Sequence, residues 1–120
     1  MSDRRKQLKE EYLATSRPMG VYRIRNTRNG KSLVGSTVNL DAIYNRHRMQ
    51  LKTDSHRNAA LAADWKSYGE EAFQFEILET LEPLDQPDYV PHEDLKFLEQ
   101  HWLEELQPWG ENGYHQIPTN

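Results

Sequence analysis

Residues 20–37 read GVYRIRNTRNGKSLVGST, and this stretch decides how the rest of the chain is organised. It begins and ends with two short runs rich in β-branched and aromatic residues, which indicate strands. Between the runs, Asn29-Gly30 favours a hairpin turn, because glycine accepts a positive φ and asparagine tolerates one. The stretch therefore predicts a β-hairpin in which Tyr22 and Leu33 come within cross-strand reach of each other.

The periodicity of apolar residues predicts the other elements. Asn39 is expected to cap one helix, Gly69 to end the next, and Phe73, Phe75 and Ile77 to form the buried face of a strand. The segment over 112–115 is expected to be a tail. In chain order we predict a helix over 3–15, strands over 20–25 and 31–36, helices over 39–52 and 57–68, a strand over 72–79 and a helix over 92–107. The order α-β-β-α-α-β-α predicts an α/β fold with a small three-stranded antiparallel sheet flanked by helices.

Length and composition set limits on the class of protein. A chain of 120 residues is expected to form a single domain, with 1–18 as an N-terminal helical extension and 19–115 as its core. The absence of cysteine excludes disulfides and thiolate metal sites. No apolar run approaches the roughly 20 residues of a membrane helix, and no apolar region of a signal peptide follows the basic N-terminus. We therefore expect a cytoplasmic protein that does not contact a membrane.

The net charge of -4 conceals an asymmetry between the two halves of the chain. Residues 1–60 carry thirteen Lys and Arg against five Asp and Glu, a balance of +8, and the remaining half carries two against fourteen, a balance of -12. A nucleic-acid backbone would be attracted to the first half and repelled by the second. The alternative is that the two halves neutralise each other in the folded domain.

An ordered series of short stretches runs along the chain from about Met19 to His115. The stretches are Gly20-Val21-Tyr22, Leu33-Val34-Gly35, Arg46-His47, Ser55-His56-Arg57-Asn58, Asp64-Trp65-Lys66-Ser67-Tyr68-Gly69, Phe73-Gln74-Phe75-Glu76-Ile77-Leu78-Glu79 and Leu98-Glu99-Gln100-His101-Trp102. In this order and spacing the series resembles the GIY-YIG nuclease superfamily. The second slot of the family signature lacks its tyrosine, since Leu33 stands there.

The resemblance implies hydrolysis of phosphodiester bonds in DNA, assisted by one divalent cation, Mg²⁺ or Mn²⁺. It implies that Tyr22 acts as a general base or positioning group at the attacking water, and that Glu99 binds the metal. His47 and His56 match the family's helix and loop histidines. Each of these four residues also has a purely structural alternative. Tyr22 could be a strand tyrosine with a satisfied hydroxyl, and Glu99 a carboxylate that reaches solvent. His47 could be a core histidine, and His56 a histidine at a helix junction.

Three departures weaken the implied activity. The second family tyrosine falls on Leu33, the phosphate-binding arginine on Ile43, and the C-terminal asparagine on His115. Loss of an arginine that stabilises charge in the transition state typically costs on the order of 10²-fold or more in rate. Arg46 lies on an adjacent position of the same helix and is the expected substitute.

Three classes of function therefore remain open: a weakened DNA endonuclease, a nucleic-acid-binding domain that has lost cleavage, and a protein-interaction module on the same scaffold. We expect Tyr22, His47 and Glu99 to converge on one surface, with Leu33 and Ile43 lining it. The predicted catalytic residues are Tyr22, His47 and Arg46, the predicted metal ligand is Glu99, and the predicted substrate contacts are Arg23, Arg25, Arg48, His56 and Arg57.

Overall fold

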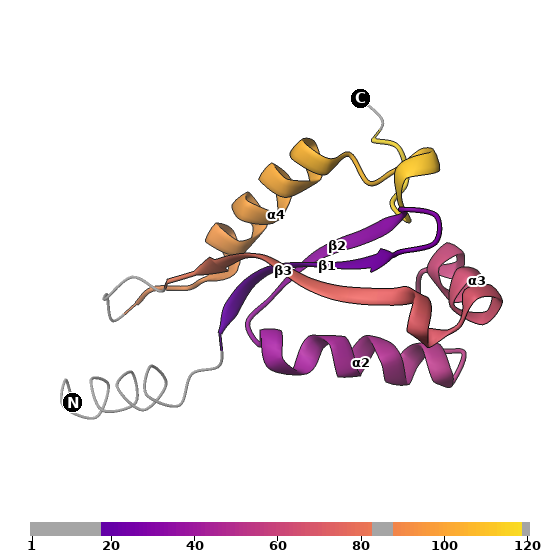
Figure 1. Ribbon diagram of the computed structural model, residues 1–120. Helices are drawn as coiled ribbons and strands as arrows, with labels where there is room; N and C mark the ends of the chain where they lie inside the picture. The colour runs from indigo at the N-terminus through magenta and orange to yellow at the C-terminus, as the bar shows by residue number, and fades with distance from the viewer. Residues whose placement is uncertain (1–17, 83–87, 119–120) are drawn as a thin grey trace.

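The computed structural model describes residues 18–82 and 88–118, and its elements follow the predicted order (Figure 1). The predicted helix over 3–15 lies outside the described residues. None of the helices within the described ranges has the length and apolar character that crossing a membrane requires. The elements are β1 (Met19–Asn26), β2 (Ser32–Thr37), α2 (Leu40–Lys52), α3 (Ala59–Tyr68), η1 (Glu70–Ala72), β3 (Phe73–Leu81), α4 (His92–Leu106) and η2 (Gly110–Asn112).

The sheet has three antiparallel strands in the order β2-β1-β3, which confirms the predicted α/β fold. The hairpin between β1 and β2 turns at Gly30, where φ is +81°. Tyr22 pairs with Gly35, and Ile24 pairs with Leu33, so Leu33 is the diagonal neighbour of Tyr22 on the same face. Tyr22 therefore lies on the central strand of the sheet, and Leu33 and Gly35 lie on an edge strand.

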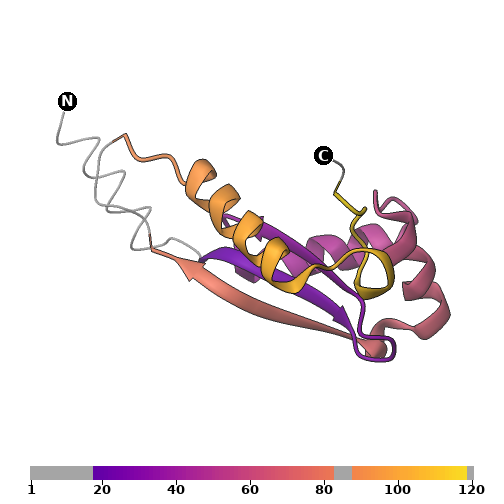
Figure 2. The same cartoon turned by 90° about the horizontal axis from the view of Figure 1, so that it is seen from above.

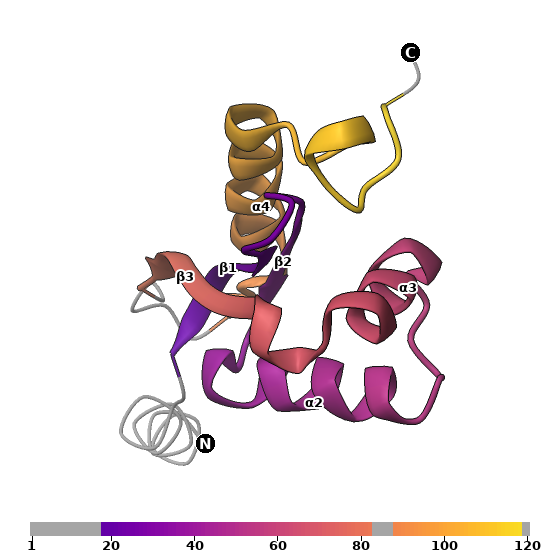
Figure 3. The same cartoon turned by 45° about the vertical axis from the view of Figure 1, so that its right-hand side comes forward.

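The two faces of the sheet carry different helices. Figure 3 shows α2 and α4 on opposite sides of the strands, and Figure 2 shows α4 running along the near side with α2 behind the sheet. The main core lies on the face that α2 and α3 cover. It consists of Tyr22, Ile24, Leu40, Leu51, Leu61, Trp65, Ala72, Phe73 and Tyr114. On the α4 face, Leu95 and the alternating strand residue Val21 are buried.

Ile77 departs from the burial that the sequence predicts for the alternating residues of β3. The β1–β3 pairing is regular from Phe73 to Ile77, the partner of Tyr22, and its register shifts only beyond that pair, between Tyr22 and Val21. Ile77 remains 51% exposed, and the predicted burial of its side chain is wrong. The reason is that the ring of its β1 partner, Tyr22, lies over Gly35 of the opposite neighbouring strand and does not cover Ile77.

The segment after α4 packs along β2 and is not the peripheral tail that the sequence predicts. Tyr114 is only 6% exposed, and its backbone N–H donates to the carbonyl oxygen of Ser32 at 3.0 Å. Its hydroxyl donates to Asp64 Oδ2 at 2.8 Å and accepts from Asn26 Nδ2 at 3.2 Å. These bonds fix the C-terminal segment to the hairpin and to α3, and they position the following residue, His115.

The caps of α2 and α3 differ from each other. Asn39 occupies the N-cap position of α2 as predicted, but its side chain makes no capping hydrogen bond, and its Oδ1 is buried without a partner. The N-cap of α3 is Asn58, whose Oδ1 accepts from the backbone N–H of Leu61 at 2.9 Å. Gly69 ends α3 with a φ of +85°, as its position in the sequence predicts.

Candidate active site

Tyr22 projects from the central strand β1, and its side chain contacts Gly35 of the edge strand β2 and His47 of α2. Its side chain is 5% exposed, and its ring packs against the rings of Phe75 and His47 at centroid distances of 5.6 Å. A Cβ on Gly35 would lie 2.5 Å from the Tyr22 hydroxyl oxygen. The glycine in the second half of the signature therefore provides the space across which the Tyr22 hydroxyl reaches the edge of the sheet.

A hydrogen-bonded chain runs from the Tyr22 hydroxyl to the start of α3. The hydroxyl oxygen lies 2.8 Å from His47 Nε2, and His47 Nδ1 lies 2.8 Å from His56 Nε2. The backbone N–H of Asn58 then donates to His56 Nδ1 at 3.0 Å. Because Asn58 also caps α3, the end of this chain is anchored to secondary structure.

Burial keeps the members of this chain uncharged at neutral pH. It lowers the pKa of His47 to about 4, with further lowering by the neighbouring His56 and Arg46. Burial also lowers the pKa of His56. It raises the pKa of Tyr22, as does the negative charge of Glu99, against the opposing effect of Arg46. Tyr22 is therefore a phenol, and both histidines are neutral imidazoles.

Glu99 reaches the same edge of the sheet from the opposite face. It lies on α4, and Ser36 Oγ of β2 donates to its Oε1 at 3.0 Å. Its charge raises the pKa values of both Tyr22 and His115, although burial leaves the pKa of His115 below its usual value. Tyr22 and Glu99 therefore influence each other electrostatically across the edge strand.

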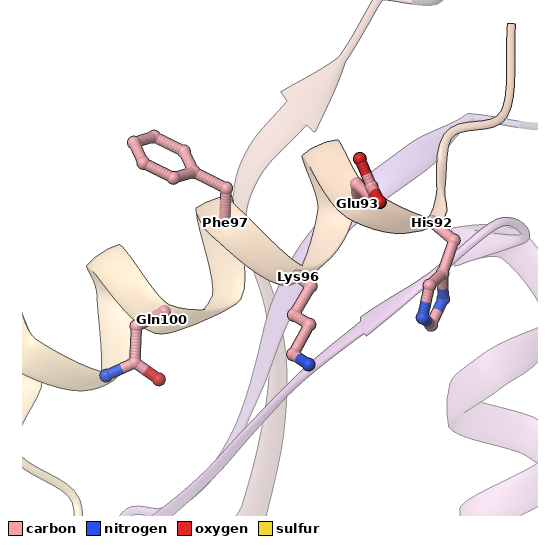
Figure 4. A pocket seen from close by; sticks show the side chains of 5 residues that line it. All are labelled: His92, Glu93, Lys96, Phe97 and Gln100. Carbon is pink, nitrogen blue, oxygen red and sulfur yellow. The ribbon is translucent and has the colours of Figure 1, made fainter.

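The Glu99 carboxylate opens onto a cleft of about 530 Å³ between β2 and the first half of α4. His92 and Lys96 lie one turn apart on α4 and extend toward the same side of the helix, whereas Phe97 points away (Figure 4). A cation therefore stands beside the carboxylate. The residues lining the cleft are Ser36, Thr37, Val38, His92, Leu95, Lys96 and Glu99.

His115 lies along the edge of β2 that does not pair with β1. The backbone N–H of Val34 donates to its Nε2 at 2.9 Å, so the proton of the neutral ring is on Nδ1. This bond and the isolated bridge between Trp109 and His115 hold the ring beside β2. His115, one of the three departures from the family pattern, therefore lies close enough to Glu99 for the carboxylate to raise its pKa.

Tyr22, His47 and Glu99, which we expect to converge, lie at one edge of the sheet but reach it from different elements. Tyr22 and His47 are in direct contact, and Glu99 approaches their edge of the sheet from α4. Leu33 and Ile43 are partly buried and pack against the core cluster that contains Tyr22. Apolar side chains therefore stand at both positions where the family pattern has a polar group.

The predicted arginine contacts divide into two groups. Glu76 accepts from Arg23 and from Arg25, and Glu70 accepts from Arg48 Nε at 2.7 Å. These bonds join the basic and acidic halves of the chain, so part of the charge asymmetry is neutralised within the domain. Within residues 18–82 and 88–118, no carboxylate lies within ion-pair distance of the other two, which are Arg46 and Arg57.

Sequence reasoning did not identify Ser36 and Asn58. Asn58 carries a recognisable signal, because an asparagine directly before Ala59-Ala60-Leu61 is typical of a helix N-cap. Ser36 has only its strand position as a signal: it alternates with Gly35 and so faces α4. Its contact with Glu99 depends on how α4 crosses the sheet, which no local pattern predicts.

The carboxylate of Glu99 fits a cation held by one protein ligand. Among the described parts of the chain, no group of three or more His, Asp or Glu side chains is arranged to hold a metal. Mg²⁺, however, is often bound by one or two carboxylates and several waters. Ser36 orients one oxygen of Glu99 and the cleft is roomy, so the donor set suits this mode of binding.

Comparisons with known proteins agree with the fold. A model of the GIY-YIG catalytic domain matches residues 18–114. The catalytic domain of homing endonuclease I-TevI is 28% identical, with a TM-score of 0.68 over 84% of this chain and 99% of that one. A mutant of the catalytic domain of intron endonuclease I-TevI is 26% identical, with a TM-score of 0.69 over 85% of this chain and 97% of that one. No curated protein matches.

Proposed function

The chain belongs to the GIY-YIG nuclease superfamily, and on that premise we propose that it hydrolyses phosphodiester bonds in DNA with the help of one divalent cation. We further propose that residues 19–115 are the nuclease core of a single domain and that 1–18 are an extension of it. The observation that carries the proposal is the contact of Tyr22 with His47 at the sheet edge that Glu99 also reaches.

In the proposed site, Tyr22 positions the attacking water, and His47 holds the Tyr22 hydroxyl in place. His56 supports His47, because both of its ring nitrogens are engaged within the protein and leave none for the substrate. Glu99 would hold Mg²⁺ or Mn²⁺, which when bound supplies positive charge to stabilise the leaving oxygen. Ser36 orients the Glu99 carboxylate for this role.

The proposed DNA path follows cations that have no ion-pair partner among the residues that the structure describes. The charge of Arg46 lowers the pKa values of Tyr22 and His47, so its guanidinium lies close enough to act on a phosphate bound beside them. Lys96 lines the cleft beside Glu99, on the other side of the edge strand. Arg23, Arg25 and Arg48 would first have to leave their carboxylate partners, so we rank them below Arg46, Arg57 and Lys96.

The two apolar departures favour slow cleavage. Ile43 cannot contact a phosphate oxygen, and Leu33 supplies no hydroxyl beside the water. Arg46 compensates for part of the lost charge but lacks the position of the family arginine. The same observation supports a second candidate function, a domain that binds DNA without cutting it. A protein-interaction module is the third.

A nicking assay on supercoiled DNA separates these three functions. We expect nicking that requires Mg²⁺ or Mn²⁺, with a loss on the order of 10²-fold or more in Glu99→Ala. Glu105→Ala is the matched control, because Glu105 is an exposed glutamate on the same helix, and we expect it to nick at the parental rate. Salt-dependent DNA binding without metal-dependent nicking would identify the binding domain, and neither activity would leave the interaction module.

A further inference from the structure

The directions of the hydrogen bonds between Asn58 and Tyr22 follow from one fixed donor. The backbone N–H of Asn58 can only donate, and it points at His56 Nδ1 over 3.0 Å. His56 Nδ1 is therefore an unprotonated acceptor. Because a neutral imidazole carries one proton, the proton of His56 is on Nε2. An imidazolium at His56 is incompatible with the Asn58 bond, since both of its nitrogens would be donors.

The same reasoning fixes the next ring and the hydroxyl. His56 Nε2 donates across 2.8 Å to His47 Nδ1, which is thus also an unprotonated acceptor. The proton of His47 is then on Nε2, which donates across 2.8 Å to the hydroxyl oxygen of Tyr22. Every bond in the chain points toward Tyr22. The hydroxyl accepts from His47, and its own hydrogen is directed away from that ring.

We propose that the backbone N–H of Asn58, acting through His56 and His47, fixes Tyr22 as a hydrogen-bond donor to the substrate side. The same bonds prevent Tyr22 from passing a proton to His47. Asn58 and His56 are thus positioning residues for the Tyr22 hydroxyl. The inference rests on the proposed nuclease function for the identity of the substrate, but the proton positions are properties of the free protein.

This arrangement decides between two roles for Tyr22. As a general base, the phenol would have to hand on its own proton before taking one from water. The nearest nitrogen, His47 Nε2, already carries a proton, and the other nitrogen of that ring is occupied by His56. Tyr22 therefore orients the attacking water or a phosphate oxygen by donation. The proton that the water loses leaves to solvent and does not pass through this chain.

The geometry around Tyr22 leaves its hydrogen a direction to point. The ring spans Gly35 at the edge strand, where no Cβ intervenes. The carboxylate of Glu99 and the guanidinium of Arg46 both lie close enough to act on the pKa of Tyr22 through their charges. A bound phosphate would thus meet a hydroxyl donor flanked by a cation and a metal-binding carboxylate.

Nitrogen NMR of the complete chain labelled with ¹⁵N-histidine tests the proposal directly. Long-range ¹H–¹⁵N correlation distinguishes protonated from unprotonated ring nitrogens. The signals that disappear in His47→Gln and in His56→Gln are assigned to His47 and His56. At pH 8 we expect protonated Nε2 and unprotonated Nδ1 in both His47 and His56. A proton on Nδ1 of either ring in the folded protein would overturn the proposal.

A matched pair of variants tests whether donation by residue 56 sets the state of His47. His56→Glu can only accept, so it should draw a proton onto His47 Nδ1. His56→Gln has nearly the same size but retains an N–H donor, so His47 Nδ1 should stay unprotonated. If His47 Nδ1 is unprotonated in folded His56→Glu, or protonated in folded His56→Gln, the donation argument is overturned.

The pH dependence of nicking distinguishes a Tyr22 that donates a hydrogen bond from a Tyr22 that acts as a general base. Replacing Tyr22 by 3-fluorotyrosine lowers the pKa of the phenol and leaves its size almost unchanged. A general base would respond with a shift of the pH–rate profile toward acid, whereas a donor leaves the profile in place. We expect no shift. A shift toward acid overturns the inference while upholding the nuclease function, and a chain that never nicks DNA contradicts the proposed function alone.

Discussion

Gly35 and Tyr22 face each other across β2 and β1 so closely that no β-carbon fits between them. A Cβ at position 35 would lie 2.5 Å from the Tyr22 hydroxyl oxygen and 2.8 Å from Cζ. The backbone of Gly35 does not have a left-handed φ, so space alone requires glycine here. Gly30 differs, because it has open space around it but a φ of +81°.

Gly35→Ala should therefore displace the Tyr22 ring and break its bond with His47. We expect a loss of about 1–3 kcal/mol in the free energy of unfolding, as in other overpacked cores, and a fall in nicking. Gly30→Ala is the control, because it should cost about 1 kcal/mol through its φ without moving Tyr22. Urea denaturation measures both. Equal stability losses together with an unchanged Tyr22 ring environment would contradict the steric argument.

The lowered pKa of His47 predicts a loss of stability in acid. Burial holds this pKa at about 4 in the folded protein, against about 6.5 in the unfolded chain. Between those two values the unfolded chain binds a proton that the folded protein does not, so the stability falls as pH decreases from about 6.5 to about 4. Below pH 4 both states are protonated, and the contribution of His47 becomes constant.

Thermal unfolding of the parent and of His47→Gln measures this contribution. The side chain is only half-buried, so solvent screening reduces the effect to on the order of 1–2 kcal/mol across the window. We expect the melting temperature of the parent to fall more steeply between pH 6.5 and 4 than that of the variant. Parallel curves would show that His47 is not held neutral by burial.

The fold was predictable from local patterns, because each pattern has one dominant cause. Asn29-Gly30 marked the hairpin and Gly69 ended α3, both through backbone conformations that the structure contains. The exposure of Ile77 was not predictable, since Ile77 keeps the alternation of β3 but the ring of its partner Tyr22 lies over Gly35 on the other neighbouring strand. Alternation within one strand contains no information about the direction that a partner's side chain takes.

The site was predictable only where the family signature supplied the positions. Tyr22 and His47 meet as their motif positions suggest, but the chain from His47 through His56 to the Asn58 amide depends on the path of a loop. The pairing of Arg23 and Arg25 with Glu76 also lies beyond local pattern, because it joins residues about fifty positions apart. Ion pairs between residues far apart in the sequence therefore decide which arginines remain available to bind DNA.

That pairing leads to a prediction about salt dependence. Arg46→Gln and Arg23→Gln each remove one positive charge, but Glu76 already neutralises Arg23 in the folded domain. We expect Arg46→Gln to reduce the slope of log K against log salt by about 1, and Arg23→Gln to change it far less. Fluorescence anisotropy with a short DNA duplex measures both slopes. Equal slopes for the two variants would remove Arg46 from the DNA path.

The departures at Leu33 and Ile43 can be reversed to test whether they limit cleavage. Leu33 pairs with Ile24 on the face that carries Tyr22, and Ile43 stands one turn before His47 on α2. Both side chains are only partly buried against the core. A tyrosine hydroxyl and a guanidinium at these positions can therefore reach solvent and are not forced into an unpaired burial.

Leu33→Tyr combined with Ile43→Arg should raise metal-dependent nicking by on the order of 10²-fold, because an oriented guanidinium stabilises charge on the phosphate in the transition state. The matched control is Leu33→Tyr with Ile43→Lys, which has the same charge without the planar fork and should gain less. Circular dichroism must first show that the variants fold. Glu99→Ala in the same background should abolish the gain, since the added groups act on a phosphate held beside the metal. A folded, Mg²⁺-binding double variant that cuts no faster than the parent would mean that the surface around Tyr22 has another purpose, and DNA binding without cleavage would then be the better description of this domain.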